Sequence, residues 1–320
     1  MSNPFISIII PCQRIDKHTK ECLNYCLKLD YQNFEIILLP DDKPKQKLSF
    51  DTDKIMILPT GAVKPSIKRN LAIRNSRADI LAFIDADAYP VSNWLKAALK
   101  YFDDENIGIV GGPNITPPAD SLTQKASGEI FSSVVGTGLT SLRYLARSKF
   151  RRGLPVKEMP SCNLLVRRDL AEKIGGFDGK FLTGEDSKFC FQVRKLGKKI
   201  INAPDVIVYH HRRRLFGGHF KQVWIYGRDK AWLIKEDFSW DKLYYFIPSF
   251  FVLGLIGGLI FWPIYWLRSI YLIIIALYLL VVLLTSLKRL FIAPLIFMGI
   301  ILTHVIYGSS FIWGLIVKQK

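Results

Sequence analysis

The stretch from Ile80 to Pro90 reads ILAFIDADAYP, and it sets the interpretation of the whole chain. Its first five residues are apolar, which is typical of a strand buried on both faces of a parallel sheet. Asp85 and Asp87 follow directly. Two carboxylates two residues apart can present oxygen atoms to one hard cation, which can bridge a diphosphate and neutralise a leaving nucleotide. A solvated turn in which Asp87 caps the next helix is the alternative.

Similar apolar runs precede this stretch. The expected strands are FISIIIP at Phe5–Pro11, Glu35–Leu39 and Lys54–Leu58, and they alternate with expected helices at Thr19–Leu29 and Ser66–Asn75. Such alternation predicts a mostly parallel sheet with right-handed crossovers. Ligands of these sheets bind beyond the carboxyl ends of the strands. The sequence therefore predicts an α/β, Rossmann-like domain with a site at that edge, whereas Ser121–Phe150 gives no clear element.

Two further acidic pairs lie at predicted element ends. Asp41 and Asp42 follow a strand, where a carboxylate can accept hydrogen bonds from a base N–H or from ribose hydroxyls; a simple turn is the alternative. Glu185 and Asp186 begin the helix expected from Glu185 to Leu196. Transfer to a hydroxyl needs a base, and either carboxylate could serve. Acidic residues at a helix N-terminus are also favourable without any catalytic role.

A basic run, HHRRR at His210–Arg214, follows the strand-like Val206–Tyr209. His210 or His211 could complete a metal shell, and the arginines could hold a diphosphate bidentately. A basic patch on a membrane surface is the competing interpretation. The remaining histidines, His18, His219 and His304, are expected to be ordinary residues.

Composition indicates two environments for one chain. Half of the residues are hydrophobic, yet the formal net charge is +17. This charge suits anionic partners such as lipid head groups or nucleotide phosphates. We expect no nucleic-acid partner, because a membrane segment explains the charge more economically and no aromatic-interleaved binding motif is present. The five cysteines form no CxxC pair, which favours reduced thiols in the cytoplasm.

Apolar density rises sharply after about Lys242. Tyr244–Leu267, Ser269–Leu287 and Leu290–Val317 are each about long enough to span a bilayer, so three connected membrane helices are expected. The second could instead belong to a re-entrant hairpin, and a buried soluble bundle is the remaining alternative. With no leader before the first strand, the N-terminal domain is expected on the cytoplasmic side, and Lys288-Arg289 would then lie inside too.

Residues His219–Lys235 carry aromatic and basic side chains and are expected to form an amphipathic helix on the membrane. The predicted domains are therefore an α/β domain over residues 1–218, an interfacial helix and linker over 219–242, and a transmembrane domain over 243–320. The expected location is the cytoplasmic membrane, as a multi-pass protein.

Several motifs, taken in order, resemble those of the family 2 glycosyltransferases, which have the GT-A fold. The resemblance covers roughly Phe5–Trp232 and includes SIIIP (7–11), LLPDD (38–42), KRN (68–70), FIDADAYP (83–90), SCNLLVRRDLAEKIGGFD (161–178) and TGEDSKFCFQVRKLGKKI (183–200). It implies a nucleotide-sugar donor, linked to UDP, GDP or dTDP, and a divalent cation, Mg²⁺ or Mn²⁺.

The resemblance also implies roles for single residues. The donor would be bound by Asp41, Asp42, Lys68, Arg69 and Asp85. The metal would be held by Asp87 with Asp85, and by His210 or His211. Asp186, or else Glu185, would be the general base of an inverting single displacement.

The pattern departs from the family in two places. Lys188 stands where the family often has a further acidic residue, which puts the usual contacts of that helix in doubt. Processive polysaccharide synthases carry QxxRW before their membrane helices, whereas YGRDKAW at 226–232 keeps only Arg228 and Trp232. Single-sugar transfer is therefore favoured over chain extrusion, although an oligomer could form a polymer channel.

A membrane anchor behind a cytoplasmic transferase indicates an acceptor that is itself in the membrane, such as a polyprenyl-phosphate or another lipid-linked sugar. Arg212, Arg213 and Arg214, with Arg228 and Trp232, are the candidates for binding it. Two other classes compete. One is a membrane-bound scaffold that binds nucleotide sugars without turnover. The other is a nucleotidyltransferase, which would need a glycine- and lysine-rich phosphate loop that residues 10–14 do not supply.

Overall fold

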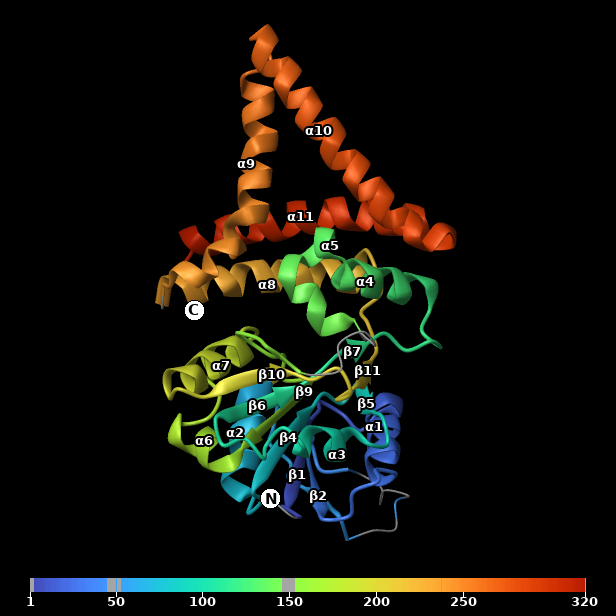
Figure 1. Cartoon of the computed structure of the whole chain (residues 1–320), viewed down its shortest axis with the longest axis vertical. Coiled ribbons are helices and arrows are strands. Elements are labelled where there is room, and N and C mark those ends of the chain that lie inside the picture. The colour runs from blue at the N-terminus through green and yellow to red at the C-terminus, as the bar shows by residue number, and fades with distance from the viewer. Residues whose placement is uncertain (1–2, 45–49, 51–52, 146–152, 237, 320) are drawn as a thin grey trace. The chain divides into compact units, whose positions relative to one another are not determined.

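The computed structural model describes residues 3–44, 50, 53–145, 153–236 and 238–319. The chain divides into two compact units (Figure 1). The α/β unit comprises residues 1–117 and 143–211, and the helical unit comprises residues 118–142 and 212–320. By these boundaries the chain passes from one unit to the other at residues 117–118, 142–143 and 211–212. The predicted boundaries at residues 218 and 242 stay a prediction.

Among the described residues, eight strands form the main sheet, in the order β3-β2-β1-β4-β9-β6-β10-β8. Their bounds are β1 Ile6–Pro11, β2 Phe34–Leu39, β3 Ile55–Ile57, β4 Ile80–Ile84, β6 Ile107–Gly111, β8 Leu154–Pro155, β9 Asn163–Arg167 and β10 Lys199–Asn202. Strands β3, β2, β1 and β4 are parallel, as expected. Strand β9 runs antiparallel between β4 and β6, so the sheet is mixed.

Helices cover both faces of this sheet. The helices are α1 Lys17–Leu27, α2 Pro65–Asn75, α3 Trp94–Leu99, α6 Arg168–Lys173 and α7 Glu185–Lys195. Along β1, Ile8 and Ile10 join the cluster made with α1 and α3, whereas Ile9 joins the cluster made with α2, α6 and α7. Because both faces are buried, β4 is apolar throughout and β1 is apolar except for buried Ser7.

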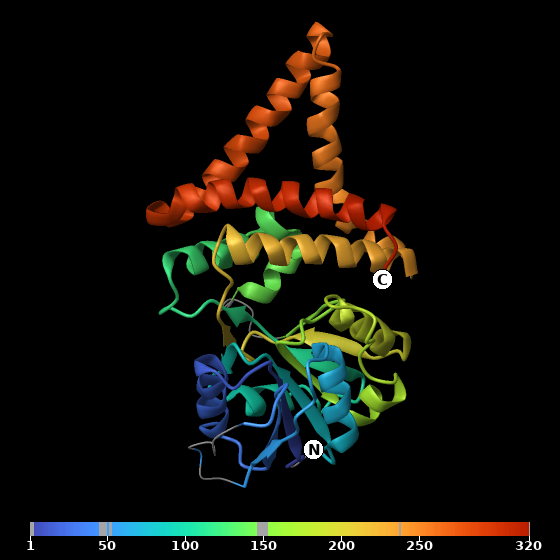
Figure 2. The same ribbon diagram turned by 180° about the vertical axis from the view of Figure 1, so that it is seen from behind.

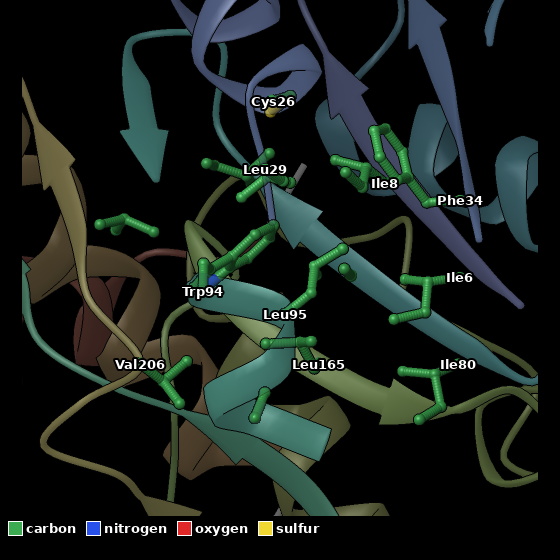
Figure 3. Packing of buried hydrophobic residues seen from close by; sticks show 14 of the residues in the cluster. Ile6, Ile8, Cys26, Leu29, Phe34, Ile80, Trp94, Leu95, Leu165 and Val206 are labelled. Atoms are coloured by element: carbon green, nitrogen blue, oxygen red, sulfur yellow. The ribbon is translucent and has the colours of Figure 1, made fainter. Parts of the chain in front are cut away.

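The buried cluster made with α1 and α3 contains a polar crosslink centred on Asn163. Trp94 and Leu95 of α3 pack against Ile8 and Leu165 in its centre (Figure 3). The indole N–H of Trp94 donates to Asn163 Oδ1 at 2.9 Å. Asn163 Nδ2 in turn donates to the carbonyl oxygens of Val206 at 2.8 Å and Pro113 at 3.3 Å. The side-chain amide of Asn163 is fully buried, and both of its polar atoms have hydrogen-bond partners, as buried polar groups usually do.

A second, small sheet builds the edge where the site lies. It has the order β5-β11-β7, with β5 at Ala88–Pro90, β7 at Asn114–Ile115 and β11 at Val208–His210. Strand β11 is antiparallel to β5, and its register pairs His210 with Ala88. This pairing carries the end of β11 to the residues that follow β4.

The helical unit consists mainly of α4 Leu122–Ser132, α5 Val134–Thr137, α8 Gly217–Glu236, α9 Ile247–Ile260, α10 Tyr265–Ser286 and α11 Ala293–Ile316, joined by the short 3-10 helices η1 Gly138–Tyr144, η2 Trp240–Phe246 and η3 Leu287–Ile292. Helix α4 packs on α11, where Ile130 shares a buried cluster with Ile296 and Ile300. Arg289, in η3, also donates to Glu129 of α4 at 2.8 Å.

Helices α8 and α11 lie side by side and run in the same direction (Figures 1 and 2). His219, near the N-terminus of α8, places its Nε2 3.0 Å from Oγ1 of Thr303 in the middle of α11. Near their C-termini, Trp232 Nε1 donates to the carbonyl of Val317 at 3.2 Å. The predicted amphipathic helix at 219–235 thus corresponds to α8, and one of its faces is covered by α11.

Helices α9 and α10 form an apolar hairpin whose tip points away from α11 within the helical unit (Figure 1), whereas Ser249 of α9 donates to the carbonyl of Gly308 at 3.1 Å and Val282 of α10 is buried with Ile296. Two helical stretches of the described chain, Lys242–Ile260 and Tyr265–Ile316, are long and apolar enough to cross a membrane, and the second includes both α10 and α11. The fold class expected from the sequence, an α/β domain followed by long apolar helices, is confirmed; the number of spans stays a prediction.

Candidate active site

Three side chains converge where β4, β5 and β11 meet. Asp85 follows β4, Asp87 precedes β5, and His210 ends β11. One ligand atom from each of these residues lies within 4.8 Å of those from the other two. His210 Nε2 lies 3.2 Å from Asp87 Oδ1, and the two aspartate side chains are 31% and 30% exposed. Two carboxylates and one imidazole at an accessible edge fit a divalent cation such as Mg²⁺ or Mn²⁺.

The protonation of His210 is governed by its neighbours. Burial alone would lower the pKa of His210, but the adjacent Asp87 and Cys162 outweigh this effect and raise it to about 10. The imidazole is therefore protonated beside Asp87 when no cation is bound. A metal ligand must be deprotonated, so a cation bound through His210 would displace this proton.

Arg69 connects this cluster to the beginning of α7. Its Nη2 donates to Asp85 Oδ1 and its Nη1 to Glu185 Oε1, both at 2.9 Å. Burial alone would lower the pKa of Arg69, but Asp85 and Glu185 outweigh this and raise it. Because both bonds are charge-assisted, the guanidinium holds the two carboxylates in fixed positions.

The two acidic residues of α7 differ in environment. Glu185 is buried, and burial, reinforced by Asp186, raises its pKa to about 7 against the opposing effect of Arg69. Asp186 is half-buried, and its Oδ1 accepts the backbone N–H of Ser187 at 2.7 Å. Gly184, with φ of 86°, supplies the left-handed turn that begins α7 here. Asp186 is therefore the carboxylate more accessible to a substrate.

Ser187 of α7 belongs to a chain of polar contacts, through Glu158 to Arg143, that the sequence did not indicate. Ser187 Oγ donates to Glu158. Arg143 Nη2 lies 3.4 Å from Glu158 Oε2, and the Arg143 side chain is 18% exposed. Neither Arg143 nor Glu158 lies in a recognisable motif. Glu158 is 15 positions from Arg143 and 29 from Ser187, so sequence spacing offered no signal for these contacts.

Lys68 and Asp41 form a second buried pair. Lys68 Nζ donates to Asp41 Oδ1 and also to the carbonyl oxygens of Cys12 at 2.6 Å and Leu39 at 3.2 Å. Asp42 is exposed. Lys68 therefore points to the ends of β1 and β2, where it positions Asp41. Arg69 instead contacts the carboxylates of Asp85 and Glu185. Phosphate binding by these two cations stays a prediction.

His211 does not join the Asp85–Asp87–His210 cluster. Its Nε2 lies 2.9 Å from Glu21 Oε2, on the side of α1. The physical reason is that adjacent residues at a strand end point to opposite sides, so His210 and His211 diverge. The spacing of His18 and Glu21, one turn apart on a helix, was the available signal for this second group.

The candidates for acceptor binding lie in the helical unit. Arg212 is buried, and its backbone N–H donates to Asp120 Oδ2 at 3.3 Å, whereas Arg213 and Arg214 are exposed. Arg228 pairs with buried Asp229 at 2.8 Å, and its guanidinium lies 4.4 Å from the ring centroid of Trp232. These contacts give Arg228 and Trp232 a packing role in α8, and their role toward an acceptor stays a prediction.

A mixed α/β sheet with an acidic edge that could hold a metal ion, and with an adjoining acidic helix, is the arrangement expected of a GT-A transferase. Residues 3–227 match the family model described as "Glycosyltransferase like family 2", so the chain belongs to this family. It is a glycosyltransferase with a nucleotide-sugar donor, as the resemblance predicted.

Two of the curated relatives that match this chain are archaeal. One, from Methanococcus voltae, is a dolichyl N-acetyl-alpha-D-glucosaminyl phosphate 3-beta-D-2,3-diacetamido-2,3-dideoxy-beta-D-glucuronosyltransferase, 24% identical over 73% of this chain and 75% of its own length. Another is glycosyltransferase AglE of Haloferax volcanii, 25% identical over 72% of this chain and 75% of its own length.

Among solved structures, a mannosyltransferase from Pyrobaculum calidifontis, in complex with GDP-Man and Mn²⁺, has a TM-score of 0.57 to this chain. The match covers 97% of this chain and 88% of that one at 16% identity, which shows the shared GT-A fold.

Proposed function

We propose that this enzyme transfers one sugar from its nucleotide donor to a lipid-linked acceptor at a membrane, with inversion at the anomeric carbon. The observation that carries the proposal is the Arg69 bridge, which joins the metal-binding edge to the acidic start of α7 through two 2.9 Å bonds. Leaving-group stabilisation and proton removal are the two demands of the reaction, and the bridge links the residues suited to each.

Each residue then has a separate task. Asp85, Asp87 and His210 would hold the divalent cation, which would supply positive charge for the departing diphosphate. Asp186 accepts the proton of the acceptor hydroxyl as its oxygen bonds to the anomeric carbon and the bond from that carbon to the diphosphate breaks. Glu185 is a positioning residue that orients Arg69. Asp41, held by Lys68, and exposed Asp42 contact the nucleoside.

The acceptor is proposed from the relatives and from composition. The Methanococcus voltae relative is named for a dolichyl-phosphate-linked acceptor. A polyprenyl-phosphate-linked acceptor is anionic, and the exposed Arg213 and Arg214 with Arg212 offer guanidinium groups for its phosphate. A lipid-linked acceptor also gives a reason for the apolar helices of the same chain.

We propose that the α9–α10 hairpin enters the membrane from the cytoplasmic side while α8 and α11 lie on its surface. Helix α11 packs along α8, which carries Lys221, Arg228 and Lys230 among other charges. Charged side chains are costly in hydrocarbon, so α8 cannot cross, and α11 cannot cross while it keeps this partner. Lys288 and Arg289 then remain inside, as in the three-span path expected from the sequence, but the C-terminus stays inside as well.

Single cysteine substitutions distinguish the two paths, because the native cysteines are all buried. Gln319→Cys is expected to react with a membrane-impermeant maleimide only after cells are permeabilised, whereas Ile264→Cys at the hairpin tip reacts in intact cells. If Gln319→Cys also reacts in intact cells, α11 crosses the membrane and the three-span path is correct.

The activity is tested with detergent-solubilised full-length protein, screened against UDP-, GDP- and dTDP-sugars with Mn²⁺ or Mg²⁺ and a polyprenyl-phosphate acceptor. Asp186→Asn is expected to bind donor but to lose roughly 10²–10⁴-fold in transfer. Asp87→Ala is expected to lose metal-dependent donor binding. Donor binding without any turnover by the unchanged protein would favour the scaffold alternative, and repeated addition to one acceptor would favour the processive one.

A further inference from the structure

A second group of metal-ligating side chains lies beside α1, apart from the Asp85–Asp87–His210 cluster. It consists of His18 and Glu21 on α1 and His211 after β11, and one ligand atom from each lies within 4.8 Å of those from the other two. Glu21 Oε2 lies 2.9 Å from His211 Nε2 and 3.8 Å from His18 Nδ1. One carboxylate oxygen therefore faces two imidazole nitrogen atoms.

These separations suit a tetrahedral ion. Bonds of about 2.0–2.2 Å to zinc place neighbouring ligand atoms roughly 3.3–3.5 Å apart, and the two observed distances lie on either side of that value. Two histidines and one glutamate also form a ligand set found at open zinc sites, where water takes the fourth position. The three side chains are 31%, 37% and 14% exposed, so an ion and its water can reach them from solvent.

The ligands are held in place before any ion arrives. Asp16 caps α1 by accepting the backbone N–H groups of His18 and Thr19, both at 3.0 Å. The backbone N–H of His211 donates to the carbonyl of Asp87 at 3.0 Å. The rings of His18 and His211 lie with their centroids 4.4 Å apart. Such preorganisation lowers the entropic cost of binding an ion.

A carboxylate–imidazole bond that merely braces the end of β11 is the simpler interpretation. That bond requires only Glu21 and His211. It does not account for His18, whose Nδ1 lies too far from Glu21 Oε2, at 3.8 Å, for a hydrogen bond yet within reach of a shared cation. The position of His18 thus favours a three-ligand site over a two-residue brace.

We propose that His18, Glu21 and His211 bind a zinc-class cation, Zn²⁺ or Co²⁺, at a site separate from the Asp85–Asp87–His210 cluster, which is called the oxygen-rich edge below. Imidazole ligands favour such ions, whereas carboxylates favour Mg²⁺ and Mn²⁺. The site with two histidines is therefore expected to prefer Zn²⁺ or Co²⁺, and the site with two aspartates is expected to prefer Mg²⁺ or Mn²⁺. Since His211 follows His210 directly, an ion at the second site fixes the backbone that presents His210. The site stands on these three residues and does not depend on the sugar-transfer assignment.

The test is Co²⁺ titration of detergent-solubilised, metal-depleted full-length protein, with Mg²⁺ in excess to occupy the oxygen-rich edge. We expect one equivalent of Co²⁺ with the visible absorption of a tetrahedral ion, displaced by Zn²⁺. Asp87→Asn is expected to leave this absorption unchanged, because it lies in the other cluster.

His18→Ala and Glu21→Gln are expected to weaken Co²⁺ binding by roughly tenfold or more. Lys20→Ala is the matched control, since Lys20 is exposed on the same helix, and it should bind like the unchanged protein. Two results would overturn the proposal. One is the absence of a tetrahedral Co²⁺ spectrum. The other is loss of binding in Asp87→Asn with retention in His18→Ala, which would assign the ion to the oxygen-rich edge.

Discussion

Replacement of Arg69 by methionine should both destabilise the α/β unit and lower transfer activity. Arg69 is 3% exposed and bonds to Glu185 and Asp85 at 2.9 Å. Methionine fills a similar volume but leaves two carboxylates without their common partner. Asp85 can be screened by solvent, because its side chain is 31% exposed, whereas that of Glu185 is only 9% exposed. The pKa of Glu185 is about 7 even beside Arg69, so without the guanidinium Glu185 takes up a proton, and the cost consists of this proton uptake and the lost hydrogen bonds.

Removal of one partner of a buried ion pair costs about 3–5 kcal/mol. In a unit of this size each kcal/mol lowers the melting temperature by about 2–4 °C, so Arg69→Met should melt roughly 6–20 °C lower. The double variant Arg69→Met/Glu185→Gln should recover about 2 kcal/mol, because glutamine is neutral without proton uptake. Transfer activity should stay low in both variants, since Asp85 is no longer held.

The assay is differential scanning calorimetry of the detergent-solubilised full chain. Arg74→Met is the matched control, because Arg74 is exposed in the last turn of the same helix and should change stability by less than about 0.5 kcal/mol. The reasoning is refuted if Arg69→Met loses under about 1 kcal/mol. It is equally refuted if the double variant is no more stable than the single one.

Three further changes test the packing by melting temperature. Burial lowers the pKa of His219 from 6.5 to about 4. About 3 kcal/mol of the free energy of unfolding, present above pH 6.5, should therefore be lost as the pH falls to 4. The variant His219→Gln should show a weaker dependence of the melting temperature on pH. Gly227→Ala should cost about 1–3 kcal/mol, because its Cβ would meet Ser310 Oγ, whereas Gly254→Ala, with nothing within 4 Å, should be neutral. Asn163→Ala should cost about 3 kcal/mol, because it leaves the indole N–H of Trp94 and the carbonyl of Val206 unpaired, whereas the carbonyl of Pro113 keeps the N–H of Val208.

Local sequence pattern accounts for the part of the fold that could be predicted. Strands β1 and β4 are buried on both faces, so the apolar run of β4 and the largely apolar run of β1 identified them. The rule that parallel strands present ligands at their carboxyl ends placed Asp85 and Asp87 correctly at a sheet edge. The antiparallel direction of β9 was not predicted, because direction depends on the path of the chain and not on periodicity.

The site was only partly accessible to such reasoning. Strands β5, β7 and β11 are two or three residues long, too short for any periodicity, yet they bring His210 to Asp87. The Arg69–Glu185 pair joins residues 116 positions apart, so no spacing rule reveals it. In the unreadable Ser121–Phe150 stretch, Ser121 and Gln124 form a capping box that could have indicated α4; residues 146–150 of that stretch lie outside the described residues.

The packing of α4 on α11 also fixes an order of events during synthesis. Ile130 is buried against Ile296 and Ile300, so α11, one of the helices that cover α4, leaves the ribosome about 170 residues later. At about 5–20 residues per second this delay is roughly 8–34 s. The two segments of the α/β unit, residues 1–117 and 143–211, are complete within that interval, and α8, whose His219 lies 2.7 Å from Ser127 of α4, follows them directly. Both segments of the catalytic unit and the first cover of α4 are therefore made before α11, and the part of α4 around Ile130 is buried only when α11 has left the ribosome.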